Sequence, residues 1–196
     1  ILLMDFPWQI GGSNPTCGVA LGYPTWTAKQ IEAFEFHKAQ PDGGFVFAWA
    51  TNWTVSQLIQ LLSKRGYKVV EYLVWVKRSC KDKLQSGTGY YFRHAKEVCV
   101  VAKSHKMEDT QGYNRMIACD VMEAPVRVQS RKPDEIYELI EAFAPDKTKL
   151  ELFARAHNAR DGWVMAGNQM IHPREVCSKA ERERQETMLN LPFKGN

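Results

Sequence analysis

The sequence has few features of membrane, secreted or metal-binding proteins. Its five cysteines are scattered and form no Cys-x-x-Cys pair, which excludes zinc ribbons and paired redox thiols and favours reduced thiols in an intracellular protein. No run of about 18 apolar residues predicts a membrane span, and no secretory signal pattern is present. We therefore expect a protein that is not secreted, does not enter a membrane, and resides in the nucleus or the cytosol.

Two common kinds of cofactor site are also missing from the sequence. The histidines and cysteines, such as His94 and Cys99, match no zinc-binding spacing, so we predict no metal site. The Gly-Thr-Gly sequence at residues 87–89 lacks the third glycine and the following helix of a dinucleotide fingerprint. A nicotinamide cofactor is therefore not expected.

Apolar strands alternate with amphipathic helices along the chain. Thr27 and Gln30 are spaced as a capping box, so a helix is predicted to begin at Ala28. This alternation indicates an α/β domain with a mostly parallel, doubly wound sheet. The predicted strands are 1–4, 45–50, 69–76, 98–102, 118–123, 150–153 and 163–166, and the predicted helices run from 28 to 37, from 55 to Gly66 and from Pro133 to Pro145.

The length of the chain suits one domain. With 196 residues and 44% hydrophobic content, it can bury one α/β core, which we place at residues 1–170. Residues 171–196 are rich in charge and are predicted to form a solvated helix or tail. Because the chain opens inside an apolar strand without an initiator methionine, we expect further residues upstream of Ile1.

Polar residues follow several of the predicted strands. Ligands of doubly wound sheets bind beyond the carboxyl ends of the strands, so polar residues at those ends are candidates for one cleft. Such residues are Asp5 after the first strand, Lys77 after the third, and Arg155, His157 and Asn158 after the strand at 150–153.

The segment from Asp5 to Trp8 has the chemistry to orient an amine. Adenine's exocyclic amine is a poor nucleophile because its lone pair is delocalised into the ring. Acceptors on both of its N–H groups direct that lone pair toward an incoming methyl group, and Asp5 with the carbonyl of Phe6 supplies two acceptors. Pro7 would fix the carbonyl, and Trp8 would stack on an extruded base. The alternative is an acidic turn beside a buried tryptophan.

A basic and aromatic segment occupies residues 77–93. It mixes lysines and arginines with Tyr90, Tyr91 and Phe92, a combination that suits contact with phosphates and stacking on bases. A solvated surface loop is the alternative interpretation. The net charge of +4 is compatible with a polyanionic partner without requiring one.

The segment Asp5-Phe6-Pro7-Trp8 resembles the Asp-Pro-Pro-Trp motif of the MT-A family of adenine N(6)-methyltransferases. The resemblance implies a Rossmann-like fold that binds S-adenosylmethionine (SAM), with a permuted motif order in which the catalytic strand comes first and the cofactor strand late. One departure is that Phe6 replaces the first proline of the family motif. Further matching blocks follow in order at Gly22–Thr25, Trp75–Lys77, His94–Glu97, Arg131–Tyr137, Glu151–Asn158 and Gly167–Gln169.

The resemblance also implies roles for individual residues. The catalytic segment would be Asp5, Phe6, Pro7 and Trp8. Cofactor contacts are implied for Asp5, Lys132, Phe153, Arg155, His157, Asn158, Asn168 and Gln169. Substrate contacts are implied for Trp8, Tyr23, Trp75, Lys77 and Glu97.

The partners implied by the resemblance are an adenine-containing nucleic acid, DNA or RNA, and a homologous inactive subunit that forms a heterodimer with this chain. A rival hypothesis makes this chain itself a non-catalytic subunit, which binds nucleic acid and a partner methyltransferase. Phe6 is the direct support for the rival. The retention of Lys132, Arg155 and Asn158 argues against it, because a subunit that does not hold SAM has no chemical need for that set.

Overall fold

The computed structural model describes residues 1–9, 24–89, 91–108, 110–127 and 130–170. Three predictions concern residues outside these ranges: the substrate contact at Tyr23, the aromatic residue Tyr90 of the basic segment, and the charged helix or tail at 171–196.

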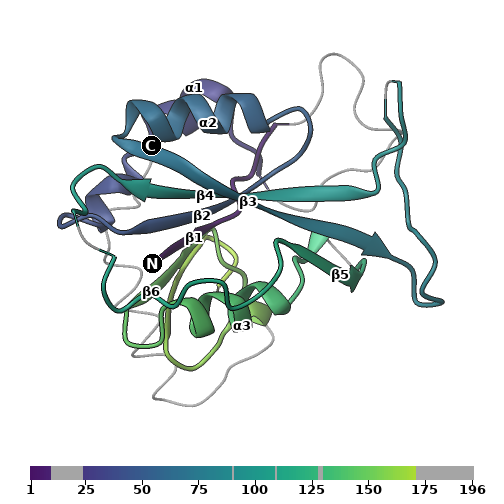
Figure 1. Cartoon of the computed structure of the whole chain (residues 1–196). Coiled ribbons are helices and arrows are strands. Elements are labelled where there is room, and N and C mark those ends of the chain that lie inside the picture. Colours follow the sequence, from purple (N-terminus) through teal and green to yellow (C-terminus); the bar gives the residue numbers. More distant parts are fainter. Residues whose placement is uncertain (10–23, 90, 109, 128–129, 171–196) are drawn as a thin grey trace.

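Seven strands form one sheet, in the order β5-β3-β4-β2-β1-β6-β7 (Figure 1). β1 pairs in parallel with β2 and β6, β6 with β7, and β3 with β5, whereas β4 runs antiparallel to both β2 and β3. The predicted mostly parallel sheet is therefore confirmed. The strands are β1 (Leu2–Met4), β2 (Phe45–Ala50), β3 (Tyr67–Arg78), β4 (Lys96–Ser104), β5 (Val121–Pro125), β6 (Lys149–Leu152) and β7 (Trp163–Ala166).

Helices cover both faces of the sheet. α1 (Ala28–Ala33) and α2 (Val55–Lys64) lie over one face, and α3 (Glu135–Phe143) lies over the other (Figure 1). Short 3-10 turns, η2 (Phe36–Ala39) and η4 (Ala156–Asn158), follow α1 and β6. This two-sided arrangement is the doubly wound architecture that the sequence predicts.

α1 begins as predicted and ends early. The capping box is present, because Thr27 and Gln30 exchange hydrogen bonds between side chain and backbone in both directions. The helix ends at Ala33 instead of His37, and η2 follows. Phe34 and Phe36 both pack against Phe6. Two residues that are two positions apart point in different directions on a helix, so burying both rings requires the helix to stop.

The long ladder of β3 and β4 extends beyond the helices (Figure 1). Both strands are longer than predicted, so Lys77 lies inside β3 and not in the loop after it. β5 starts at Val121, later than the predicted residue 118, because its register is set by the pairing of Val74 with Val121.

β1 lies in the middle of the sheet and divides the core. Leu3 belongs to the apolar cluster on the α3 side, whereas Leu2 and Met4 belong to the cluster under α1 and α2. Met4 pairs with residues near the ends of both neighbouring strands, Ala48 of β2 and Leu152 of β6. Asp5, the next residue, is therefore placed at the carboxyl edge of the sheet, where a doubly wound fold binds ligands.

Candidate active site

A cleft of about 110 Å³ opens at this edge of the sheet. β1, β2, β6 and β7 end there, and β4 starts there because it runs antiparallel to β2. The topology thus brings together segments that are far apart in the sequence. The predicted site residues that line the cleft are Asp5, Phe6, Pro7, Trp8, Glu97, Lys132, Phe153, Arg155, Asn168 and Gln169.

Four charged side chains form a row of alternating sign, of which Asp5, Lys132 and Glu97 line the cleft and Lys77 lies behind Glu97. The Lys132 Nζ lies 2.7 Å from the Asp5 Oδ2 and 3.2 Å from the Glu97 Oε2. Glu97 in turn receives a hydrogen bond of 2.6 Å from the Lys77 Nζ. The side chains of Lys132 and Glu97 are each only 13% exposed, so each charge depends on its neighbours for compensation.

The surroundings of Asp5, Lys132 and Glu97 shift the pKa values of these groups in different directions. Burial acts to lower the pKa of Lys132, but Asp5 and Glu97 outweigh it and raise that pKa, so the ammonium stays charged. Burial acts to raise the pKa of Glu97, but Lys132 and Lys77 outweigh it and lower that pKa. For Asp5, burial dominates and raises the pKa, and Lys132 offsets the rise only in part. Of the two carboxylates, Asp5 therefore accepts a proton more readily than Glu97 does.

Phe6, the departure from the family motif, is accommodated by an aromatic cluster. The side chain is 3% exposed, and its ring centroid lies 5.6 Å from that of Trp8 and 5.2 Å from that of Phe153. The Phe6 carbonyl accepts a hydrogen bond of 2.8 Å from the Trp8 N–H across Pro7. This bond orients the carbonyl, and a carbonyl oxygen has a second lone pair for another donor.

The two predicted tryptophan contacts differ in outcome. Trp8 lines the cleft, although it is only 8% exposed and offers little of its ring to a base. Trp75 is 1% exposed, lines no part of the cleft, and donates its Nε1–H to the Ala124 carbonyl. The structure therefore does not bring Trp75 to the cleft, and its contact with substrate stays a prediction. Its ring instead lies beneath Lys77, whose Nζ is 5.2 Å from the ring centroid.

The backbone after β7 approaches the backbone after β6 closely, at Gly167 and Ala154. A Cβ on Gly167 would lie 2.1 Å from the carbonyl oxygen of Ala154 and 2.7 Å from its nitrogen, so no other residue fits without movement. The Ala154 N–H donates to the Ala166 carbonyl, and the Ala156 N–H donates to that of Gln169. This junction places the residues after β6 beside those after β7.

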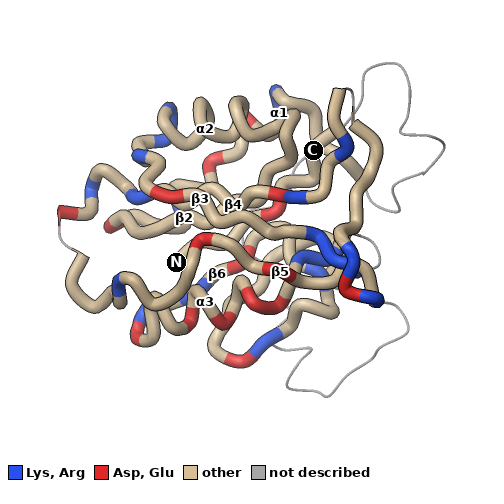
Figure 2. The backbone as a smooth tube through the Cα atoms, turned by 45° about the vertical axis from the view of Figure 1, so that its right-hand side comes forward, with Lys and Arg blue, Asp and Glu red and all other residues tan. Residues whose placement is uncertain are grey.

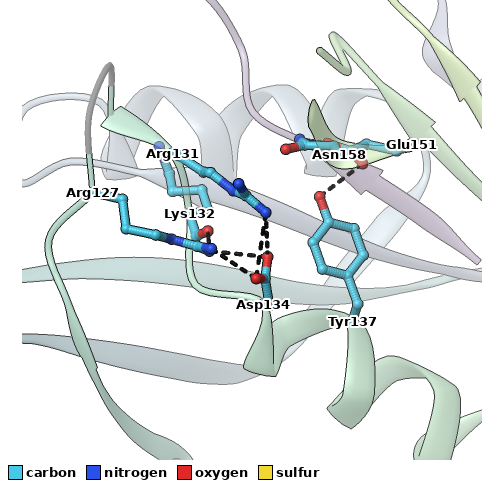
Figure 3. Close-up of polar contacts among 7 residues, drawn as sticks. All are labelled: Arg127, Arg131, Lys132, Asp134, Tyr137, Glu151 and Asn158. Atoms are coloured by element: carbon cyan, nitrogen blue, oxygen red, sulfur yellow. Dashed lines mark hydrogen bonds and ion pairs between the residues drawn. The ribbon is translucent and has the colours of Figure 1, made fainter. Parts of the chain in front are cut away.

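A smaller pocket continues beneath the cleft, on the α3 side, and contains residues that the sequence did not indicate. Glu151 is 5% exposed and accepts hydrogen bonds from the Tyr137 hydroxyl at 2.9 Å and the Asn158 Nδ2 at 2.8 Å (Figure 3). Burial raises the pKa of Glu151 to about 7. Trp49 lines both pockets, and Lys132 lies over its ring. Asn158 lines the smaller pocket and not the cleft, whereas His157 is exposed and lines neither pocket.

The titration of Glu151 is expected to make stability depend on pH. Its pKa rises from 4.5 in the unfolded chain to about 7 in the fold, so the folded protein holds a proton that the unfolded chain releases between these values. The bound proton stabilises the fold fully below pH 4.5. This stabilisation, roughly 3 kcal/mol, is lost as pH rises through about 7.

Urea unfolding across this pH range should therefore show a decline in stability that Glu151→Gln removes. Glu138→Gln, at an exposed position on α3, is the matched control and should keep the decline. An unchanged decline in Glu151→Gln would contradict the assignment of the titration to Glu151.

Among the described residues, no cluster of three or more metal-binding side chains is present. In the same part of the chain, no helix is long and apolar enough to cross a membrane.

A mostly parallel, doubly wound sheet with a polar cleft at its carboxyl edge defines an α/β protein of the Rossmann-like class. The sequence model of the MT-A70 family matches residues 1–169, and the chain belongs to that family. The resemblance seen in the sequence motifs is thereby confirmed.

Curated relatives agree with this assignment. The chain is similar to the N(6)-adenosine-methyltransferase subunit METTL3 of Danio rerio, with 34% identity over 98% of this chain and 32% of the relative. It is also similar to the N(6)-adenosine-methyltransferase catalytic subunit METTL3 of Homo sapiens, with 35% identity over 87% of this chain and 28% of the relative. The non-catalytic subunit METTL14 of Xenopus tropicalis matches at 25% identity over 76% of this chain and 35% of the relative. The chain thus spans about a third or less of the METTL3 relatives.

Proposed function

We propose that this chain carries the catalytic site of a methyltransferase that transfers a methyl group from SAM to the exocyclic N6 amine of adenine in a nucleic acid. The observation that carries the proposal is the placement of Asp5 and the Phe6 carbonyl, two hydrogen-bond acceptors, at the end of the central strand in the same cleft as Lys132 and Asn168. The METTL3 relatives are named as adenosine methyltransferases.

The donor set of the cleft fits SAM. Asp5 offers a carboxylate to the ammonium of the amino acid part, and Lys132 offers an ammonium to its carboxylate; the two are already 2.7 Å apart. Asn168 and Gln169 line the same cleft and suit ribose hydroxyls, and Phe153 suits the face of an adenine ring. When bound, SAM supplies an electrophilic methyl group on a sulfonium sulfur.

The chain's own residues would prepare the acceptor amine. The Asp5 carboxylate and the Phe6 carbonyl each accept one N–H of the adenine amine, which aims its lone pair away from the ring. The Trp8 N–H holds the Phe6 carbonyl in place. Methyl transfer would leave a neutral thioether and a positively charged amine, which is strongly acidic; Asp5, whose pKa burial raises, would accept the released proton before it passes to water.

The extended β3–β4 connection is the candidate surface for the nucleic acid. Tyr91 and Phe92 are 91% and 83% exposed there, and Lys81 and Lys83 are exposed nearby. Figure 2 shows lysine and arginine segments gathered beside β5, at the same end of the molecule. Charge for phosphates and rings for bases support this placement. A homologous non-catalytic subunit is the partner that we propose, because the chain is also similar to one.

The test is a tritium-transfer assay from labelled SAM to matched adenine-containing DNA and RNA, as duplexes and single strands, with the homologous partner present and absent. Asp5→Ala should reduce transfer by about 100-fold or more, whereas Asp42→Ala, at an exposed turn, should leave it unchanged. Circular dichroism should show both variants folded. Calorimetry with SAM distinguishes this proposal from the rival hypothesis, because an assembled protein that does not bind SAM is a non-catalytic subunit.

A further inference from the structure

The residues before α3 show an unusual use of a helix-capping aspartate. Asp134 is the N-cap of α3, a position where an aspartate side chain ordinarily accepts hydrogen bonds from the first turn of the helix. Its carboxylate makes no such bond. Arg127 and Arg131 from the preceding segment bind the Asp134 carboxylate instead, so this carboxylate does not cap the helix.

Arg127 binds the carbonyl of Lys132 and the carboxylate of Asp134, two residues further along (Figure 3). Its Nη1 and Nη2 lie 2.7 Å and 3.0 Å from the two carboxylate oxygens of Asp134. The same Nη2 also donates to the backbone carbonyl of Lys132. Arg131 adds a second contact, with its Nη2 3.2 Å from the Asp134 Oδ1. The backbone of Lys132 is therefore tied to a bidentate ion pair formed by residues before and after it.

Neither Arg127 nor Asp134 reaches the cleft. Both are absent from the residues that line the two pockets, whereas Lys132 lines both and directs its Nζ to Asp5 and Glu97. Pro133 restricts the backbone of the residue before it to extended conformations. The segment thus has few ways to move, and the bond from Arg127 selects one of them. Hydrogen bonding from Arg127 also lowers the pKa of Asp134, so the ion pair persists at neutral pH.

We propose that Arg127 and Asp134 are positioning residues that fix the backbone of Lys132, so that its ammonium is held ready for the carboxylate of a bound amino acid moiety. This inference rests on the proposed function, in which that moiety belongs to SAM. A purely structural role, the docking of α3, would act on stability and not on one part of the ligand.

Two nucleosides separate these roles. S-adenosylhomocysteine carries the amino acid carboxylate, and 5′-methylthioadenosine lacks it. Arg127→Lys, which loses the planar fork, and Asp134→Asn should each bind S-adenosylhomocysteine about 10- to 100-fold more weakly, as expected for a displaced charged group. Both variants should bind 5′-methylthioadenosine like the native protein. Isothermal calorimetry measures the affinities, and thermal unfolding checks the fold.

Two further variants sharpen the test. Arg160 and Glu141 form a comparable bidentate pair beside α3, so Arg160→Lys is the control and should not change either affinity. The exchange of Arg127→Asp with Asp134→Arg restores opposite charges but places no guanidinium at position 127 to bind the Lys132 carbonyl, so it should remain weak for S-adenosylhomocysteine.

The outcomes are distinct. Equal weakening for both nucleosides, or no weakening for either, would overturn the positioning role while leaving the proposed function intact. If the native protein, assembled with its partner, binds neither nucleoside, the proposed function fails and this inference fails with it.

Discussion

Lys132→Met is expected to abolish methyl transfer and to lower the free energy of unfolding at neutral pH by about 3 kcal/mol, because removing one member of a buried ion pair leaves its partners uncompensated. The ammonium of Lys132 lies between Asp5 and Glu97 at 2.7 Å and 3.2 Å. Without it, Glu97 keeps Lys77 as a partner, but Asp5 is left without its nearest cation. Urea unfolding measures the stability, and tritium transfer measures the activity.

The stability deficit of this variant should shrink in acid. Lys132 helps to lower the pKa of Glu97 below its usual 4.5, so its stabilisation is present above that value and is lost as pH falls through the lower pKa of the fold. The stabilities of native and variant proteins should therefore converge as pH falls below 4.5 and through the lowered pKa of Glu97. Lys96→Met, an exposed substitution on β4 next to Glu97, is the control for loss of charge. A variant with native transfer would refute the role of Lys132.

Gly167→Ala is expected to destabilise the fold by about 3 kcal/mol or more and to eliminate SAM binding, because the added methyl group overlaps backbone atoms that cannot rotate away. The overlap is with the oxygen and nitrogen of Ala154, at 2.1 Å and 2.7 Å. Relief requires β6 and β7 to separate at their carboxyl ends. That movement would shift Arg155 and Asn168, which line the cleft from opposite sides of the junction.

The matched control is Gly162→Ala, in the turn that leads into β7. Gly162 has a φ of +80° and nothing within 4 Å of an added Cβ, so the substitution carries only backbone strain of about 1 kcal/mol. Thermal unfolding and calorimetry with SAM compare the two variants. Similar losses in both would show that the contact with Ala154 is not the cause.

The sequence predicts the parts of the site that depend on strand ends. Asp5 and Arg155 follow compact apolar strands, and the rule that parallel strands end at one edge is enough to bring them together. Lys132 could not be placed in this way, because it follows no strand closely, and only the resemblance to a family assigned it. Its approach to Asp5 depends on how α3 packs under the sheet, which local sequence does not encode.

Burial on a strand was harder to predict than the strand itself. Trp75 and Lys77 point to the same side of β3. Ala124 of β5 covers Trp75, whereas Lys77 stays partly exposed. The existence of that cover depends on the pairing between β3 and β5, a long-range contact. Glu151 was missed for a similar reason: inside a short strand it resembles an ordinary solvent-facing residue, and only the position of Tyr137 on α3 encloses it.

The central position of β1 affects how the protein is made. Leu2 pairs with Val46 on one side and with Leu150 on the other, so β1, the first of these seven strands to be translated, must wait for a partner strand that is translated much later. Such non-local pairing folds slowly and leaves apolar segments accessible to chaperones in the meantime. A nascent chain that stops short of β6 lacks Phe153, Arg155 and Asn168 and therefore cannot complete the cleft around Asp5.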